Sequence, residues 1–252
     1  MQKIINQNLI SYETIVRTYN KTTSDNKEVL IRQEEIIIAD VKTTQKNVFL
    51  PDEIDGCPIS DISAFAFENN DSVEHITLPS QLKSIRRYAF KNCKNLKTID
   101  IPASVNLIED SSFINCTSLK EVSLLNDVLV IFDKAFDGCT QLEKINMPGT
   151  YCCLNKDVFD NTAFYNDESN WEDGVLYVCH CLVTAKGVKN TYKVKDGTTT
   201  IASFAFKDNT ELTDIILPDS VSYIGYLAFD GCESLNSITA PKGIFDYDTP
   251  LF

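Results

Sequence analysis

Phenylalanine recurs at a fixed interval of 23 residues through most of this chain. Five phenylalanines are evenly spaced, and two more resume the interval after a gap of 47 residues, two repeats plus one residue: Phe67, Phe90, Phe113, Phe136, Phe159, Phe206 and Phe229. With 14 phenylalanines among 252 residues, so regular a series does not arise by chance. Self-similarity at a period of roughly 20 to 50 residues is the signature of a repeat protein. The period therefore constrains the fold before any single motif does.

Each of these phenylalanines belongs to a longer motif. Five residues before it the chain carries Ile or Leu, one residue before it Ala, Ser or Val, and two residues after it Asn, Gly or Asp. Asn, Gly and Asp tolerate a left-handed backbone, so a tight turn with positive φ is predicted after every Phe. Three residues after the Phe stand small groups that can face inward and bond the turn: Asn70, Cys93, Cys116, Cys139, Thr162, Asn209 and Cys232.

An apolar triplet with alternating spacing follows each turn, as in Leu96, Ile99 and Ile101. Such alternation is typical of a short β-strand with one buried face. A single coil of this length cannot bury its own apolar residues, but stacked coils can, because each covers its neighbour while their strands pair about 4.8 Å apart. The sequence predicts a curved solenoid with a ladder of short parallel strands on its concave side, turns in the return segments and little helix.

The pattern from Leu96 to Cys116, repeated from Leu212 to Cys232, resembles the BspA-type leucine-rich repeat. The resemblance covers roughly residues 48 to 241. The segment NWEDGVLYVCHCLVTAKG is similar to a β-hairpin inserted within such arrays, and we place this insert at about 165–191. The resemblance implies a leucine-rich repeat solenoid. As a tendency, it also implies part of a bacterial cell-surface protein that binds other proteins or host matrix, as in adhesion.

The two ends are expected to close the array. We divide the chain into an N-terminal segment and cap, 1–47, and a repeat array, 48–252, within a single domain. Residues 27–38 are predicted to form strands that cover the open edge of the first coil. At the other end two alternatives remain open: the array is truncated at residue 252, or four apolar residues fold back as a cap, Ile244, Phe245, Leu251 and Phe252.

Location and partners are constrained by charge and by the N-terminus. The family resemblance implies surface display, whereas the lack of a hydrophobic secretion segment after Met1 and the unpaired thiols fit a cytoplasmic protein. No apolar run reaches about 18 residues, so membrane insertion is not expected. The net charge of −13 opposes binding to nucleic acid and favours a neutral or basic protein partner, unless it serves solubility alone. The oligomeric state stays open.

Nine cysteines raise the question of disulfides or metal. Four of them occupy the repeat position that also accepts Asn and Thr, which indicates a small hydrogen-bonding group, not thiol chemistry. The other five form an odd set, which argues against a complete disulfide framework: Cys57, Cys152, Cys153, Cys179 and Cys181. The best metal candidate is Cys179-His180-Cys181, with Cys152 and Cys153 upstream. Cys179 and His180 are expected in a hairpin turn, where adjacent side chains do not converge on one ion. We predict no metal and no cofactor.

Enzymatic motifs are not found either. The chain has two histidines, His75 and His180, and no nucleophile elbow, zinc-protease motif or phosphate-binding loop. His75 is expected on the solvent face of a strand. We predict no catalytic residues and a protein that is not an enzyme.

Two surfaces are candidates for binding. The first is the ladder face, where the outward residues of successive strands would stack into one array: His75, Thr77, Thr98, Asp100, Glu121, Ser123, Lys144, Asn146, Asp214 and Ile216. The second is the insert with Phe164, Tyr165, Trp171 and Tyr177, although Trp171 could instead seal the core. The predicted function is protein, matrix or glycan recognition by one of these surfaces; the alternative is an architectural spacer in a larger cell-surface protein.

Overall fold

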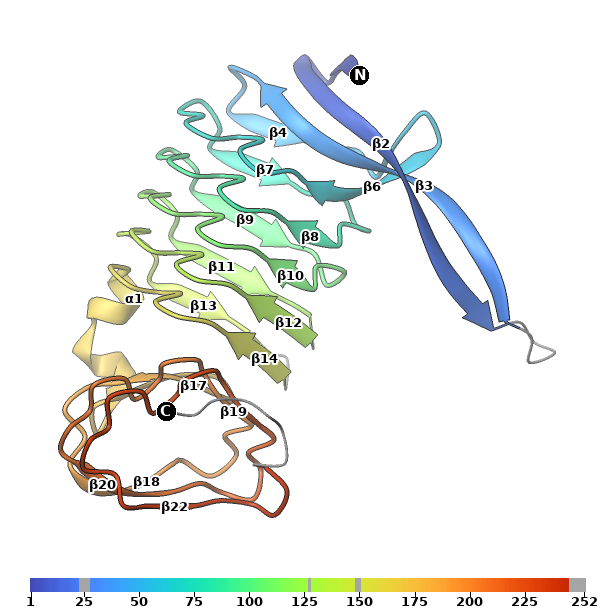
Figure 1. Ribbon diagram of the computed structural model, residues 1–252. Coiled ribbons are helices and arrows are strands. Elements are labelled where there is room, and N and C mark those ends of the chain that lie inside the picture. The colour runs from blue at the N-terminus through green and yellow to red at the C-terminus, as the bar shows by residue number, and fades with distance from the viewer. Residues whose placement is uncertain (23–27, 127, 148–150, 245–252) are drawn as a thin grey trace.

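A computed structural model describes residues 1–22, 28–126, 128–147 and 151–244 (Figure 1). The described chain is built almost wholly from strands and turns. Its helices are one short turn, α1 (Ala163–Asn166), and a 3-10 turn, η1 (Glu168–Asn170). The predicted parallel-strand solenoid with little helix is confirmed.

Each coil of the first part of the chain gives one strand to a ladder and one to a second sheet. The ladder strands are parallel: β4 (Asn47–Phe49), β7 (His75–Thr77), β9 (Thr98–Ile101), β11 (Glu121–Leu124) and β13 (Lys144–Asn146). The second sheet continues in parallel through β6 (Cys57–Ile62), β8 (Ser84–Ile85), β10 (Leu107–Ile108), β12 (Val128–Ile131) and β14 (Tyr151–Leu154). A short strand, β5 (Glu53–Ile54), pairs antiparallel with β6.

A long antiparallel hairpin opens the first stack (Figure 1). It consists of β2 (Asn8–Thr22) and β3 (Glu28–Lys42), and β1 (Gln2–Ile5) extends it by one strand. Ile36, Ile37 and Ile38 of β3 pair in parallel with β6. The strand predicted at residues 27–38 thus covers the first coil. The strand β2, which lies before it in the sequence, was not predicted.

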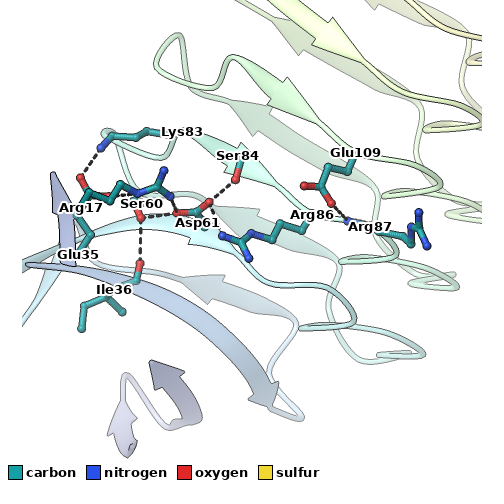
Figure 2. A network of polar contacts seen from close by, with 10 residues as sticks. All are labelled: Arg17, Glu35, Ile36, Ser60, Asp61, Lys83, Ser84, Arg86, Arg87 and Glu109. Atoms are coloured by element: carbon teal, nitrogen blue, oxygen red, sulfur yellow. Dashed lines mark hydrogen bonds and ion pairs between the residues drawn. The ribbon is translucent and has the colours of Figure 1, made fainter. Parts of the chain in front are cut away.

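Charged side chains fix this hairpin to the first coils (Figure 2). Glu35 of β3 and Asp61 of β6 are almost fully buried. Arg17 of β2 pairs with both, with its Nε 2.6 Å from a Glu35 oxygen and an Nη 2.5 Å from an Asp61 oxygen. Lys83 also pairs with Glu35, and Arg86 lies 3.1 Å from Asp61. Each buried carboxylate therefore pairs with Arg17 of the hairpin and with one cation from the coil of β8.

The seven phenylalanines that recur with the repeat, here called the comb, lie in the centre of the core. All seven are almost completely buried. In the first stack their rings are stacked, with centroids between 4.9 and 5.7 Å apart. The last two, Phe206 and Phe229, stack at 5.4 Å. The predicted column is confirmed, with an interruption between Phe159 and Phe206, where Phe159 packs on Phe164 and Phe206 packs on Tyr192.

The turns follow the motif. Each residue two positions after a comb Phe has φ between 57° and 73°, as predicted: Asn69, Asn92, Asn115, Gly138, Asn161, Asp208 and Gly231. The inward cysteines bond the preceding coil; Cys116 Sγ, for example, donates to the carbonyl of Phe90 at 3.1 Å. A second left-handed row, two positions before each Phe, was not predicted: Phe65, Tyr88, Ser111, Lys134, Asp157, Phe204 and Leu227.

The first stack ends after residue 160, and a second stack begins where the hairpin insert is expected, at about 165–191. A second hairpin is formed by β15 (Trp171–Glu172), β16 (Val175–Val178) and β17 (Cys181–Ala185), with the turn at Cys179 and His180 as predicted. Two parallel groups follow, β19 (Thr200–Ile201) and β21 (Tyr223–Ile224) after β17, and β18 (Asn190–Lys193), β20 (Leu212–Ile216) and β22 (Ser237–Thr239). The ladder resumes at β18, which begins at Asn190.

Both stacks begin in the same way. In the first, β3 pairs with β6 and then the Val41 amide donates to the Ala66 carbonyl at 2.9 Å. In the second, β17 pairs with β19 and then the Ala185 amide donates to the Ala205 carbonyl at 2.7 Å. In both stacks the chain then continues for seven residues to a ladder residue, Val48 in the first stack and Tyr192 in the second. The insert is therefore the opening hairpin of a second stack, whose coils Figure 1 shows nearly end-on.

Candidate functional site

The ladder of the first stack presents a continuous polar face. Its outward side chains come from neighbouring coils in strict register, so that Thr98 lies between His75 and Glu121, and Asp100 between Thr77 and Ser123. All eight predicted residues of β7, β9, β11 and β13 are exposed except Ser123, which is half-buried. His75 Nδ1 lies 2.7 Å from Thr98 Oγ1. The alternation of the strands therefore places the predicted side chains on one surface.

A row of ion pairs borders this face. Glu74 lies 2.6 Å from Lys46 Nζ and 2.5 Å from Lys97 Nζ, in the coils before and after it. Hydrogen bonds from these two lysines lower the pKa of the Glu74 carboxyl to about 2. Further along, Glu121 lies opposite Lys144 on the next strand. The face therefore offers fixed charges of both signs beside hydroxyl and amide groups.

Asp214 and Ile216 do not continue this array, contrary to the prediction. They lie on the separate sheet β18–β20–β22, because the restart at residue 160 ends the first ladder at β13. Asp214 there accepts hydrogen bonds from Ser237 at 2.5 Å and Thr213 at 2.8 Å, which lower its pKa. Thr191, which the sequence analysis missed, lies 3.4 Å from the same carboxylate. Its signal was available, because Thr191 precedes Asp214 by one repeat.

The aromatic residues of the insert are engaged with one another. Trp171 Nε1 donates to the Tyr165 carbonyl at 2.8 Å, and the two rings pack edge to face at 5.3 Å. Lys186 Nζ lies 3.9 Å from the Tyr165 ring centre and 4.7 Å from that of Trp171. Phe164 packs on the comb, and the hydroxyls of Tyr177 and Tyr192 are 3.1 Å apart. These half-buried contacts favour the sealing role of Trp171, and a binding role for the insert stays a prediction.

The cysteines and histidines outside the repeat position do not gather. His180 Nδ1 lies 3.1 Å from the Gly197 carbonyl, whereas Cys181 is buried in β17 and Cys179 is exposed in the turn. The side chain of Cys152 falls outside the described residues. Within those that are described, no group of three or more His, Cys, Asp or Glu is placed to hold a metal ion. The predicted C-terminal cap lies largely outside the described residues as well, because Phe245, Leu251 and Phe252 are not among them.

A partly buried carboxyl group, that of Asp160, lies where the first stack ends. Burial of Asp160, together with the nearby charges of Asp157 and Asp137, raises its pKa from 3.8 to about 6, against the opposing effect of Lys186 and Lys134. A raised pKa in the folded state means that ionisation of this group costs stability. The cost is absent below about pH 4 and develops as the pH rises through about 6.

We expect Asp160→Asn to stabilise the protein at neutral pH. The shift of about two pKa units corresponds to about 3 kcal/mol, which half-exposure reduces to about 1 kcal/mol. Urea unfolding at pH 7.5 should show this gain, and at pH 4 the variant and the parent should unfold at the same urea concentration. Asp219→Asn, at an exposed position of the second stack, is the matched control and should change little at either pH. A gain in stability that is equal at both pH values would contradict the raised pKa of Asp160 as its cause.

Among the described residues, no helix has the length and apolarity required to span a membrane.

Comparison with known proteins gives a family. The family described as "BspA type Leucine rich repeat region" matches residues 41–167 and 189–252, in 6 copies. The chain is similar to the leucine rich repeat protein TpLRR of T. pallidum, with 23% identity over 87% of this chain and 88% of that one, at a TM-score of 0.49. It is also similar to a leucine rich cell surface protein of Faecalibacterium prausnitzii, with 18% identity over 95% and 76% of the two chains, at a TM-score of 0.43. It is similar as well to the pneumococcal vaccine antigen PcpA, with 16% identity over 97% of this chain and 71% of that one, at a TM-score of 0.44. No protein of curated function matches the chain.

Proposed function

Because the chain belongs to the BspA-type leucine-rich repeat family, whose domains generally act as interaction modules, we propose that it is a non-enzymatic module that binds a protein partner through the first ladder face. The observation that carries this proposal is the register of that face. Two rows of outward side chains are held on a ladder of five paired strands, so docking orders few groups and loses little entropy.

The charge of the face suggests the kind of partner. Asp100 and Glu121 lie exposed on neighbouring strands near the middle of the ladder. The whole chain carries a net charge of −13, which steers neutral or basic surfaces toward it and repels acidic ones. The proposed partner is therefore a protein that places lysine or arginine side chains against these two carboxylates. The domain division at residues 47 and 48 and the roles of the individual ladder residues are part of this proposal.

The test is the joint substitution Asp100→Ala and Glu121→Ala. A partner is first isolated on the intact chain, purified, and titrated against both proteins. We expect the joint variant to bind at least tenfold more weakly, with an unchanged melting temperature, because both changes are at exposed positions. A joint variant with Asp219→Ala and Glu233→Ala removes the same charge from the second stack and should bind as the parent does. Equal binding by all three proteins, or no saturable partner at all, would favour the spacer.

A further inference from the structure

A groove opens at the start of the second stack. After the hydrogen bond between Ala185 and Ala205, the chain leaves through Lys186 and Gly187 instead of following the next turn. The gap is lined by residues 185–187 on one side and by residues 207–211 on the other, with a volume of about 280 Å³. It lies beside the aromatic pair of the insert, because Lys186 contacts both rings.

Interior coils show what is missing from this groove. There the amide of each left-handed Asn donates to the next coil; Asn69 donates to the Lys91 carbonyl at 2.8 Å, and Asn92 to the Ile114 carbonyl at 2.9 Å. The equivalent acceptor in the groove is the Lys207 carbonyl. Gly187, with φ of 63°, stands in the place of the donor residue. No N–H among the described residues donates to the Lys207 carbonyl. One main-chain acceptor in the row of turns is thus left without a protein donor.

A side-chain donor is left open as well. In the interior coils the residue three positions after the Phe is a cysteine that donates to the preceding coil, as Cys93 does to the Phe67 carbonyl at 3.0 Å. Asn209 occupies this position in the groove. It is 93% buried, and its Nδ2 has no acceptor among the described residues. A buried amide without a partner costs stability, and a ligand that supplies an acceptor recovers this cost.

The first stack opens with an equivalent groove, which supplies a comparison. It is lined by residues 40–44 and 66–72 and also by Ile4, Gln7 and Leu9, and here too the position three after the Phe is an asparagine, Asn70. Asn70 is only half-buried, and its Oδ1 accepts from the amides of Ser72 at 3.0 Å and Val73 at 3.2 Å. Both starts therefore carry Asn where the interior coils carry Cys or Thr, but the buried, unpaired amide belongs to the second start.

We propose that the groove at Asn209 binds a short peptide turn. A carbonyl of the peptide accepts from Asn209 Nδ2, and an amide of the peptide donates to the Lys207 carbonyl, as a preceding coil would do. A turn with Gly or Asn fits best, because the coil turns at this level have positive φ. The groove is slightly smaller than the roughly 300 to 1,000 Å³ of typical ligand pockets, so the affinity is expected to be weak.

The experiment is an amide NMR titration of the full ¹⁵N-labelled chain with the blocked tripeptide acetyl-Gly-Asn-Gly-amide. We expect saturable shifts at the amides of residues 207–211. Asn209→Ala and the isosteric Asn209→Asp, which cannot donate, should weaken binding at least tenfold, whereas Asn70→Ala should bind as the parent does. The joint variant at Asp100 and Glu121 should also bind as the parent, which separates this site from the ladder face.

Three results would overturn the proposal. The first is the absence of saturable shifts in the parent protein. The second is binding that survives both substitutions of Asn209. The third is a methyl glucoside that causes the same Asn209-dependent shifts while the tripeptide causes none, since the groove would then recognise hydroxyl groups. Folding of the variants is checked by their melting temperatures, so that a loss of binding is not mistaken for a loss of structure.

Discussion

Replacing Phe113 by alanine should lower the free energy of unfolding by about 4 kcal/mol. The ring is fully buried and lies between those of Phe90 and Phe136, with centroids 5.0 and 5.1 Å away and ring planes within 2° of parallel. Neither neighbour can move into the space without leaving its own coil, so the cavity stays open. Urea unfolding followed by circular dichroism measures the loss.

The position of Phe113 predicts a second effect. In a solenoid each coil contacts only its neighbours, so a weakened interface in the middle of the first stack lets the two sides unfold separately. We expect a broader transition in addition to the lower midpoint. Phe132→Ala is the matched control, because this Phe lies outside the comb and is 37% exposed; it should cost less than about 1 kcal/mol. Equal losses for the two variants would show that the column is not the spine of the fold.

The regular part of this fold was predictable because its signals are local. A strand reveals itself through alternation, and a left-handed turn through Asn, Gly or Asp, which appear at all seven positions two after the comb Phe. The second left-handed row was not predictable. Phe65, Tyr88 and Lys134 are residues that avoid positive φ, at a cost of roughly 1 kcal/mol or more each, and they adopt it because the closed coil leaves no other path.

The restart at residue 160 was missed for a different reason. A hairpin that interrupts a stack and a hairpin that opens one have the same sequence pattern. The two cases differ only in which strand pairs with β17, and here that strand is β19. The gap of 47 residues in place of two repeats was one sign, and the Asn at positions 70 and 209 was another. The ladder face was therefore predicted correctly strand by strand. The placement of Asp214 and Ile216 in the same array was wrong, because pairing between strands that far apart in sequence is not encoded in either of them.

The buried acids of the opening hairpin were also beyond a sequence reading. Glu35 sits in a strand that alternation predicts, but nothing local shows that it is buried or that Asp61, 26 residues later, lies on the same face. Burial opposes ionisation of Asp61. The hydrogen bonds from Ser60 and Ser84 and the charge of Arg17 outweigh it and hold the pKa of Asp61 below its usual value. Asp61 therefore stabilises the folded state only while it is ionised.

We expect Arg17→Met to cost about 2 kcal/mol at pH 7, because it removes one cation from two buried carboxylates while keeping the apolar stem of the side chain. The estimate lies below the roughly 3 to 5 kcal/mol of a fully buried pair, since Arg17 is 38% exposed and Lys83 and Arg86 remain. Because the pKa of Asp61 is depressed in the folded state, its contribution is present above about pH 4 and is lost as the pH falls through the folded value. The difference between parent and variant should therefore shrink in acid.

Hydrogen exchange locates the effect of Arg17→Met. Amides of β2 and β3 should exchange faster in the variant, while those of β11, deep in the first stack, should keep their protection. Arg32→Met removes the same charge from an exposed position of the same hairpin and should leave both stability and exchange unchanged. If Arg32→Met destabilises as much as Arg17→Met, or if the loss at Arg17 measured at pH 7 persists unchanged well below about pH 4, the hairpin is held by its strand pairing alone. The observed burial of Glu35 and Asp61 argues for the other outcome, because removing a paired cation from a buried carboxylate destabilises the folded state.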